Sequence, residues 1–468
     1  MKSIVLQQKE ELAYLTSQPY QARLPLEKVE PFLDSQVIKL ITGPRRAGKS
    51  VFAFQILHGR NFAYLNFDDS YLLDKFDEDA VMQALSEVYP GYTHLLLDEV
   101  QNLDAWDLWV GKLKRRGVNL VITGSNARML SSEMATVLTG RYVEIEILPF
   151  SMAENMAYRN IDIRPELPEA KAALMLEAEA YMRTGGFPEI AKTREITKSY
   201  VGALFDSIIL KDVAQRHKLR KTQELYTLAD YLISNYCNQL SYNDIADGLG
   251  MGSVNTVKKF CDYLAEPYLF FYLPRFDNKL RLMKKAPRKI YVADNGFVFA
   301  RSFELSSNKG RQLENMVFVE LMRQGYKPGD TLFYYHTKND REIDFVLKAG
   351  YKVSCLVQVS YDISNAKTRE RELKALEEAA GELKCENLLL ITWGTDDMAE
   401  YKGHTIKIVS VRNWFYACKL PYILNIPVVT SQKATDTPHP DRWLFIPCSD
   451  SVSSARHRTP HCRSRWQS

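Results

Sequence analysis

Hydrophobic residues in the first 150 positions gather in short runs that are separated by polar stretches. Three of these runs are nearly unbroken and a fourth alternates with polar residues; they cover residues 37–41, 95–97, 118–122 and 142–149. Unbroken runs of this length are typical of strands buried on both faces, as in a parallel sheet covered by helices. A further aromatic-rich run at 61–67 predicts another strand, and residues 79–88 have helical periodicity. The pattern therefore predicts an α/β fold with a parallel sheet.

A glycine-rich segment joins the first run to the helix predicted after it. It reads Gly43-Pro44-Arg45-Arg46-Ala47-Gly48-Lys49-Ser50, and Val51 follows. Strand, loop and helix in this order, with the spacing G-x-x-x-x-G-K-[ST], are the signature of a P-loop. Its backbone N–H groups and the positive end of the new helix attract phosphate. The segment predicts that residues 43–51 bind ATP and that Lys49 contacts the phosphates, with the Ser50 hydroxyl as a ligand of Mg²⁺.

Polar residues end three of the later strands, where they can meet the P-loop. Asp98 and Glu99 follow the run at 95–97, and we expect Asp98 to hold Mg²⁺ and Glu99 to polarise the attacking water. Asn126, or its neighbour Ser125, is expected to sense the γ-phosphate; a simple strand-end cap is the alternative. Arg141 precedes the last strand, and it is either an arginine finger that acts across a homo-oligomer interface or an ordinary surface residue.

These motifs resemble those of the AAA+ superfamily, in its branch with an additional strand and a catalytic glutamate. More closely, the chain is similar to a large group of bacterial and archaeal ATPases that join this module to a C-terminal domain of unknown function. The phrases that carry this likeness are Gly43 to Ser50, Leu148-Pro149-Phe150-Ser151 and Gly185-Gly186-Phe187-Pro188-Glu189. The resemblance spans residues 20 to 420 and implies an ATPase, without a cellular task.

The middle of the chain predicts helices and then a helix-turn-helix. We expect an N-terminal helical segment at 1–19, the ATPase domain at 20–150 and a helical lid at 151–235. In residues 236–292, Ser241 and Ser253 suit the N-caps of two helices, and Gly250 suits the turn between these helices. This pattern predicts a winged helix-turn-helix. The loop from Arg275 to Lys289 carries seven basic residues and one acid. Contact with double-stranded DNA and protein docking both fit such a module.

The pattern at 293–420 resembles the PD-(D/E)XK nuclease fold, with an acid at Asp344. Gln358 and Ser360 stand where the second acid and the lysine of a metal-dependent nuclease are expected. A neutral amide and a hydroxyl bind a hard cation poorly. Lys367 on the following helix could at most substitute for the lysine of the nuclease motif. We therefore expect a nuclease-like domain without cleavage. Residues 421–468 have no periodicity and predict a disordered tail.

Composition adds little to this picture. The 468 residues carry a net charge of +4, which favours no particular partner, and seven scattered cysteines suggest reduced thiols and a cytoplasmic protein. No apolar run reaches membrane-spanning length. Three functions stay open: an ATP-hydrolysing switch or motor with a DNA- or protein-binding platform, a non-hydrolysing ATP-dependent regulator, and an ATP-dependent nuclease.

Overall fold

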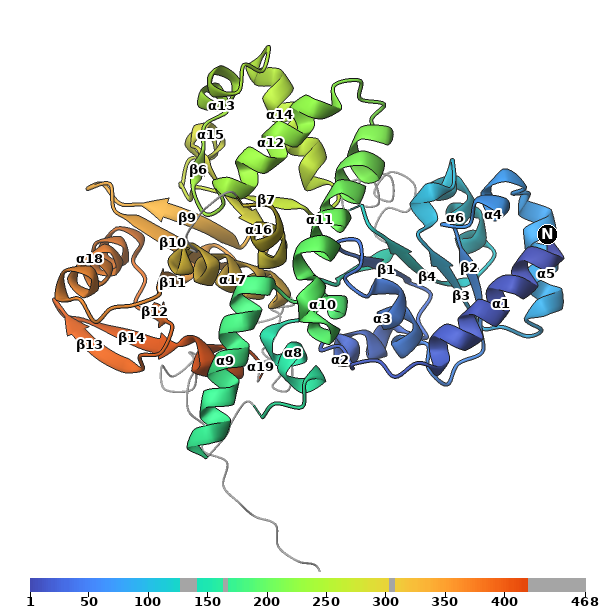
Figure 1. Cartoon of the computed structure of the whole chain (residues 1–468), viewed down its shortest axis with the longest axis horizontal. Helices are drawn as coiled ribbons and strands as arrows, with labels where there is room; N and C mark the ends of the chain where they lie inside the picture. The colour runs from blue at the N-terminus through green and yellow to red at the C-terminus, as the bar shows by residue number, and fades with distance from the viewer. Residues whose placement is uncertain (127–140, 163–166, 303–307, 420–468) are drawn as a thin grey trace, which may run out of the picture. The chain divides into compact units, whose positions relative to one another are not determined.

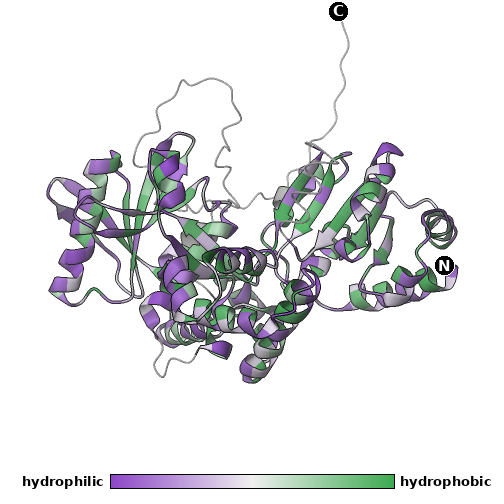
Figure 2. Cartoon of the chain, turned by 90° about the horizontal axis from the view of Figure 1, so that it is seen from above, coloured by the Kyte–Doolittle hydropathy of each residue, from purple (hydrophilic) through white to green (hydrophobic). Residues whose placement is uncertain are grey.

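The computed structural model describes residues 1–126, 141–162, 167–302 and 308–419 (Figure 1). A compact unit spans Met1–Leu424, and the tail predicted at 421–468 lies outside the described residues. Within the described residues, the strands form a five-stranded, a three-stranded and a six-stranded sheet. The strands carry mostly hydrophobic residues and the helices around them present many hydrophilic ones (Figure 2). The mixed α/β class predicted from the sequence is confirmed.

The first sheet has the order β2-β3-β4-β1-β5, and every neighbouring pair is parallel. Its strands are β1 (Ile38–Thr42), β2 (Phe62–Asn66), β3 (His94–Asp98), β4 (Asn119–Gly124) and β5 (Tyr142–Glu146). All residues of β1, β3 and β4 are buried, which explains why these strands read as apolar runs. Because the strands are parallel, their carboxyl ends meet at one edge of the sheet.

Helices surround this sheet and form its core with it. They are α1 (Lys2–Ser17), α2 (Leu26–Val29), α3 (Lys49–Ile56), α4 (Ser70–Asp74), α5 (Glu78–Val88) and α6 (Trp106–Arg115), with 3₁₀ turns η1 (Glu30–Phe32) and η2 (Val100–Asn102). The first helix, α1, packs on α5 and β2, and the buried Gln8 amide donates to the backbone oxygen of Asn66. The N-terminal helical segment is therefore part of this layer.

The helical region after the first sheet begins at a capping box. Ser151 and Glu154 exchange hydrogen bonds at the start of α8 (Met152–Tyr158). The helices that follow are α9 (Pro168–Thr184), α10 (Pro188–Lys192), η3 (Arg194–Ile196), α11 (Thr197–Ser207), the π-helix η4 (Ile208–Gln215) and α12 (Thr222–Ser234).

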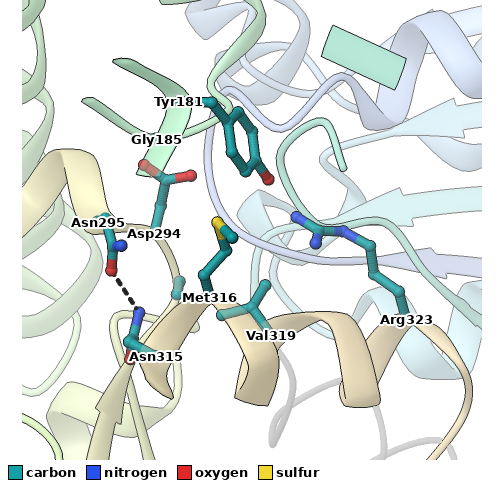
Figure 3. Close-up of a pocket in the computed structure, with 9 residues that line it drawn as sticks. Tyr181, Gly185, Asp294, Asn295, Asn315, Met316, Val319 and Arg323 are labelled. Carbon is teal, nitrogen blue, oxygen red and sulfur yellow. Dashed lines mark hydrogen bonds between the residues drawn. The ribbon is translucent and has the colours of Figure 1, made fainter. Parts of the chain in front are cut away.

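The two glycines after α9 lie against a buried carboxylate (Figure 3). Gly185 has φ +80°, and a Cβ atom on it would lie 1.5 Å from Asp294 Oδ1. The Gly186 N–H donates to Asp294 Oδ2 at 2.7 Å. Burial raises the pKa of Asp294 to about 6, although N–H groups of Gly186 and Gly296 oppose this. Glycine at 185 is required because no side chain fits there.

A small antiparallel sheet with the order β6-β8-β7 follows, together with the helices α13, α14 and α15. Its elements are β6 (Gln239–Leu240), α13 (Tyr242–Gly248), α14 (Val254–Ala265), β7 (Phe270–Pro274), α15 (Leu280–Lys285) and β8 (Arg288–Val292). Ser241 and Ser253 accept the N-cap hydrogen bonds of α13 and α14, and Gly250 has φ +61° in the turn between them. These local features agree with the sequence prediction.

The six-stranded sheet lies at the C-terminal end, with the order β13-β14-β12-β11-β10-β9. Its elements are β9 (Leu332–His336), β10 (Glu342–Ala349), β11 (Lys352–Ser360), α18 (Ala366–Leu383), β12 (Leu388–Thr392), β13 (Asp397–Tyr401) and β14 (His404–Ser410), preceded by α16 (Asn295–Arg301) and α17 (Lys309–Arg323) and followed by α19 (Val411–Lys419). Strand β13 was not expected, since only Ala399 of it is buried.

Candidate nucleotide-binding site

The loop between β1 and α3 has the backbone that its glycines predict. Gly43 has φ +142°, and a Cβ atom on it would lie 2.0 Å from the backbone oxygen of Ile147. Gly48 has φ +92° and is the N-cap of α3. Both positions have backbone conformations that favour glycine. Because glycine has no side chain, the N–H groups of the loop at the start of the helix are not covered at these positions.

Four predicted side chains of the P-loop and β3 lie together at the carboxyl edge of the sheet. Lys49 is buried, and its Nζ donates to the backbone oxygen of Pro44 at 3.1 Å and lies 3.4 Å from Glu99 Oε1. The Ser50 hydroxyl donates to Asp98 Oδ1 at 2.9 Å. Lys49 thus pairs with Glu99, and Ser50 pairs with the adjacent Asp98, at the same edge of the sheet.

Asp98 is held at the end of β3 by hydroxyl groups. Thr123 Oγ1 donates to Asp98 Oδ1, and Tyr64 donates to Oδ2 at 3.3 Å. Burial, and then the neighbouring charge of Glu99, raises the pKa of Asp98 to about 6. The carboxylate is therefore ionised at neutral pH, and the hydroxyl groups of Ser50, Thr123 and Tyr64 donate hydrogen bonds to it.

Glu99 has a special backbone and a different electrostatic environment. Its φ of +51° is left-handed, and its N–H donates to Thr123 Oγ1 at 3.0 Å. Its carboxylate accepts from Gln101 Nε2 at 2.5 Å and from Ser125 Oγ at 3.1 Å. Burial alone would raise the pKa of Glu99, but the Lys49 charge and these hydrogen bonds bring it below its usual value.

The sequence did not reveal several residues that support the site. Arg23 is buried and donates to the backbone oxygens of Ala47 and Leu148, at 2.7 and 2.6 Å, and to the Glu154 carboxylate at 2.8 Å. It fixes the P-loop from a segment twenty residues earlier. Thr123 and Tyr64 donate hydrogen bonds to Asp98, and Gln101 donates one to Glu99. Each contact joins distant parts of the chain or lacks a motif, so no local pattern could indicate it.

Three further predicted residues lie in different places. Asn126 is fully buried just after β4, and it is Ser125 whose hydroxyl reaches Glu99. Arg141 is exposed, and its backbone oxygen accepts from Ile38 N–H at the start of β1. Since the P-loop follows the other end of β1, Arg141 lies at the opposite edge of the sheet and cannot contact a phosphate of its own chain.

The donor set at the P-loop fits a magnesium–triphosphate complex. Mg²⁺ is usually held by one or two carboxylates together with phosphate oxygens, and Asp98 and the Ser50 hydroxyl supply oxygen donors side by side. Lys49 and the glycine-lined loop supply positive charge and N–H groups. Among the described residues, no group of three or more His, Cys, Asp or Glu side chains could hold a metal ion by itself. The site therefore fits a cation that arrives with phosphate.

Asp344, the acid of the nuclease-like pattern, lies beside a buried cation. Lys289 is buried, and its Nζ lies 2.7 Å from Glu314, 2.7 Å from Glu342 and 3.2 Å from Asp344. Burial alone would lower the pKa of Lys289, but these carboxylates raise it well above its usual range. Lys289, one of the seven basic residues counted from Arg275 to Lys289, is therefore not available to contact DNA, because its buried side chain pairs with this acidic cluster.

Two more expectations about this half of the chain need correction. The stretch from Arg275 to Lys289 is not only a loop, because α15 forms within it; Lys279, Arg281, Lys284, Lys285 and Arg288 remain exposed. The position beside Gln358 is not without a carboxylate, because Gln358 Nε2 donates to Glu372 at 2.9 Å. Lys367 is exposed at the start of α18. Position in the sequence alone did not reveal these neighbours.

The parallel sheet with its P-loop and acidic strand end defines an AAA-type P-loop ATPase domain. Comparison with protein families agrees: the family described as AAA domain matches residues 35–156. Two families described as domains of unknown function, DUF8612 and DUF4143, match residues 175–307 and 309–414. They assign no winged helix and no nuclease to the rest of the chain.

Two curated relatives align with most of the chain. An uncharacterized protein of Methanocaldococcus jannaschii is 35% identical over 394 residues, which are 81% of this chain and 88% of the relative. An uncharacterized protein of Haemophilus influenzae is 31% identical over 355 residues, 72% of this chain and 86% of the relative. The chain belongs to the family that these archaeal and bacterial proteins represent.

Similar solved structures include two other ATPases. The Walker-type ATPase of Pyrococcus abyssi is 17% identical and has a TM-score of 0.39, covering 61% of this chain and 98% of that one. A signal transduction ATPase with a tetratricopeptide repeat sensor from Pyrococcus horikoshii is 14% identical and has a TM-score of 0.27, covering 66% and 47%. At these TM-scores the likeness carries no argument about the whole chain. In the part of the chain that the structure describes, no helix is long and apolar enough to cross a bilayer.

Proposed function

We propose that the chain binds ATP with Mg²⁺ at the P-loop and hydrolyses it. The observation that supports this most is that Lys49 pairs with Glu99 and Ser50 pairs with the adjacent Asp98 at the carboxyl edge of the sheet. Residues 43–51, apart from Pro44, donate their backbone N–H groups to the phosphates, and Lys49 exchanges its contacts with Pro44 and Glu99 for phosphate oxygens. Mg²⁺, when bound to Ser50 and Asp98, neutralises charge that develops on the phosphates.

Glu99 is the proposed general base. Its carboxylate stays ionised because of Lys49, and Gln101 and Ser125 orient it, so it can accept a proton from water placed against the terminal phosphate. Asn126 is proposed as a sensor of that phosphate. Arg141 contributes only from a neighbouring copy, as it lies at the far edge of its own sheet, which implies a homo-oligomer.

ATP turnover of the wild type, Glu99→Gln and Lys49→Ala tests this proposal. Glu99→Gln should keep the affinity for ATP and lose about 100-fold or more in turnover, because the base is gone and the shape is kept. Lys49→Ala should lose binding itself. Asp104→Asn, which neutralises an exposed carboxylate five residues away, is the matched control. Equal turnover in the wild type and Glu99→Gln would favour the non-hydrolysing regulator instead.

The ATPase is proposed to drive or gate a DNA-binding platform in the second half. We assign the ATPase domain to 20–150, the lid to 151–235, a winged helix to 236–292 and a nuclease-like domain to 293–420. The capped helices α13 and α14, the antiparallel pair β7 and β8, and the exposed basic residues on and beside α15 support a winged helix that contacts phosphates.

DNA retardation as a function of salt tests the platform. A variant with glutamine at Lys279, Arg281, Lys284 and Lys285 should bind duplex DNA more weakly and with a smaller salt dependence, because each lost phosphate contact reduces the slope by about 0.9. The control variant places glutamine at four exposed lysines elsewhere, Lys338, Lys352, Lys367 and Lys402. Equal retardation of both variants would assign the second half to protein docking.

Nuclease activity is not proposed. Lys289 already pairs with Asp344 and its neighbours Glu314 and Glu342, and its ammonium charge offsets part of their negative charge. A divalent cation would have to displace a buried, paired charge to reach them, which is unfavourable. Incubation of labelled DNA with Mg²⁺ or Mn²⁺ should leave it intact.

A further inference from the structure

One arginine of the P-loop is bound to a distant part of the chain. The Arg45 guanidinium forms a bidentate ion pair with Asp212, with Nε at 3.0 Å from Oδ2 and Nη2 at 2.9 Å from Oδ1. The Asp212 side chain is 3% exposed and that of Arg45 is 22% exposed. The hydrogen bonds that Arg45 donates to Asp212 raise the pKa of Arg45, and the charges of Asp212, Glu99 and Asp68 add to this. The Arg45 side chain thus joins the phosphate-binding loop directly to Asp212.

Asp212 belongs to an unusual element. It lies in the π-helix η4, whose wide hydrogen-bonded turns are rare and occur often at functional sites. Five of the eight residues of η4 are buried, and the helix packs on α11, α12 and α14. The ion pair therefore joins the P-loop to a packed helix rather than to a surface loop.

The same segment is fixed to the proposed recognition helix. His217, two residues after η4, stacks on Tyr263 of α14 with ring centroids 3.5 Å apart and planes inclined by 13°. Its Nε2 lies 2.7 Å from Glu266 Oε2 at the end of α14. Direct contacts thus connect Arg45, η4 and α14 in an unbroken series.

A triphosphate would compete with Asp212 for the same guanidinium. The planar fork of arginine binds phosphate and carboxylate with the same bidentate geometry, so it cannot satisfy both ligands fully. If Arg45 leaves, the Asp212 carboxylate remains buried without its cation, which favours a different packing of η4. A ligand that draws Arg45 away thus biases a helix in contact with α14.

We propose that Asp212 is a positioning residue that holds Arg45 while the site is empty, and that the terminal phosphate of ATP takes Arg45 over and releases η4. This rests on the proposed function of the P-loop. It adds the route by which nucleotide occupancy reaches the winged helix, and it makes the response specific for ATP over ADP, because only ATP carries the terminal phosphate that takes Arg45 over.

Affinities for Mg·ATP and Mg·ADP and amide hydrogen exchange of residues 208–217 and 254–266 test this. In the wild type, ATP but not ADP should speed exchange in these two segments. Asp212→Asn should bind ATP about three- to tenfold more tightly, since a competing carboxylate worth about 1 kcal/mol is removed, and its exchange should no longer respond. Asp212→Glu should restore the response. A merely structural ion pair predicts the opposite sign, weaker ATP binding with Asp212→Asn.

Two controls separate the possible failures. Asp206→Asn neutralises a half-exposed carboxylate on the neighbouring α11 and should behave like the wild type. If neither the wild type nor Lys49→Ala binds ATP, the proposed function fails. If the wild type binds ATP and Lys49→Ala does not, but exchange in η4 and α14 is the same with and without ATP, only this inference fails. The wild-type exchange measurement needs no variant to fold, so it decides the question even if Asp212→Asn is unstable.

Discussion

Removal of the Asp98 charge should stabilise the protein in the absence of nucleotide. The pKa of this carboxyl rises from 3.8 to about 6 in the folded chain, mainly because of burial and then because of Glu99. Between these pH values the folded state binds a proton that the unfolded state does not, so stability falls as the pH rises through this window. Each tenfold difference in proton affinity is worth about 1.4 kcal/mol, so the ionised Asp98 costs about 3 kcal/mol at pH 7.5.

Asp98→Asn keeps the shape and removes this cost. Urea unfolding at pH 7.5 without nucleotide should therefore show the variant more stable than the wild type, by up to about 3 kcal/mol. The difference should shrink at pH 4, where Asp98 is already protonated in the folded wild type. The exposed Asp104→Asn serves as the control and should show no such gain. Mg·ATP should stabilise the wild type but not Asp98→Asn, because the metal ligand is lost.

A variant that is less stable than the wild type at pH 7.5 would refute this reasoning. It would mean that the hydroxyls of Ser50, Thr123 and Tyr64 solvate the carboxylate better than water does. A gain that persists unchanged at pH 4 would also contradict it, since the gain would then be unrelated to ionisation.

Three other changes give separate tests. Gly185→Ala should lower the free energy of unfolding, measured in urea, by about 3 kcal/mol, because the new Cβ collides with the Asp294 carboxylate and the residue keeps φ +80°. The control Gly59→Ala, which has a positive φ but open space around the new Cβ, should cost less. Lys289→Met should cost about 3–5 kcal/mol at pH 7.5, since three carboxylates lose their cation, and a loss below 1 kcal/mol would contradict the buried network. Arg141→Ala should abolish turnover when it is assayed alone. A mixture of Arg141→Ala and Glu99→Gln should recover part of the turnover, because the first variant supplies an intact Glu99 and the second supplies an intact Arg141 across the interface. No recovery would place Arg141 outside catalysis.

The nucleotide site could be predicted from the sequence because its signals are local. The spacing from Gly43 to Ser50 and the acids directly after β3 appear within a few residues of the strands that position them. The caps Ser241 and Ser253 were visible for the same reason.

What the sequence concealed depends on partners far along the chain. Lys289 looked like one more basic residue of a loop, and only the fold brings Glu314, Glu342 and Asp344 to it. Asp212 lies 167 residues from Arg45, and nothing in either segment indicates the pairing. Buried charges are stable only when they are paired, so their positions follow from tertiary structure and not from periodicity.

The boundary between the two hydrophobic cores falls between two consecutive residues. Ile147 belongs to the core of the parallel sheet, whereas Leu148 begins a second core that continues through the lid helices as far as Phe415. Close-packed interiors resist internal shear, so the helices at 151–235 do not move apart from the other elements of this core. Any movement of these helices relative to the P-loop would therefore carry the helices and strands that share the second core with them, against the contacts of Arg23 with Glu154 and of Arg45 with Asp212.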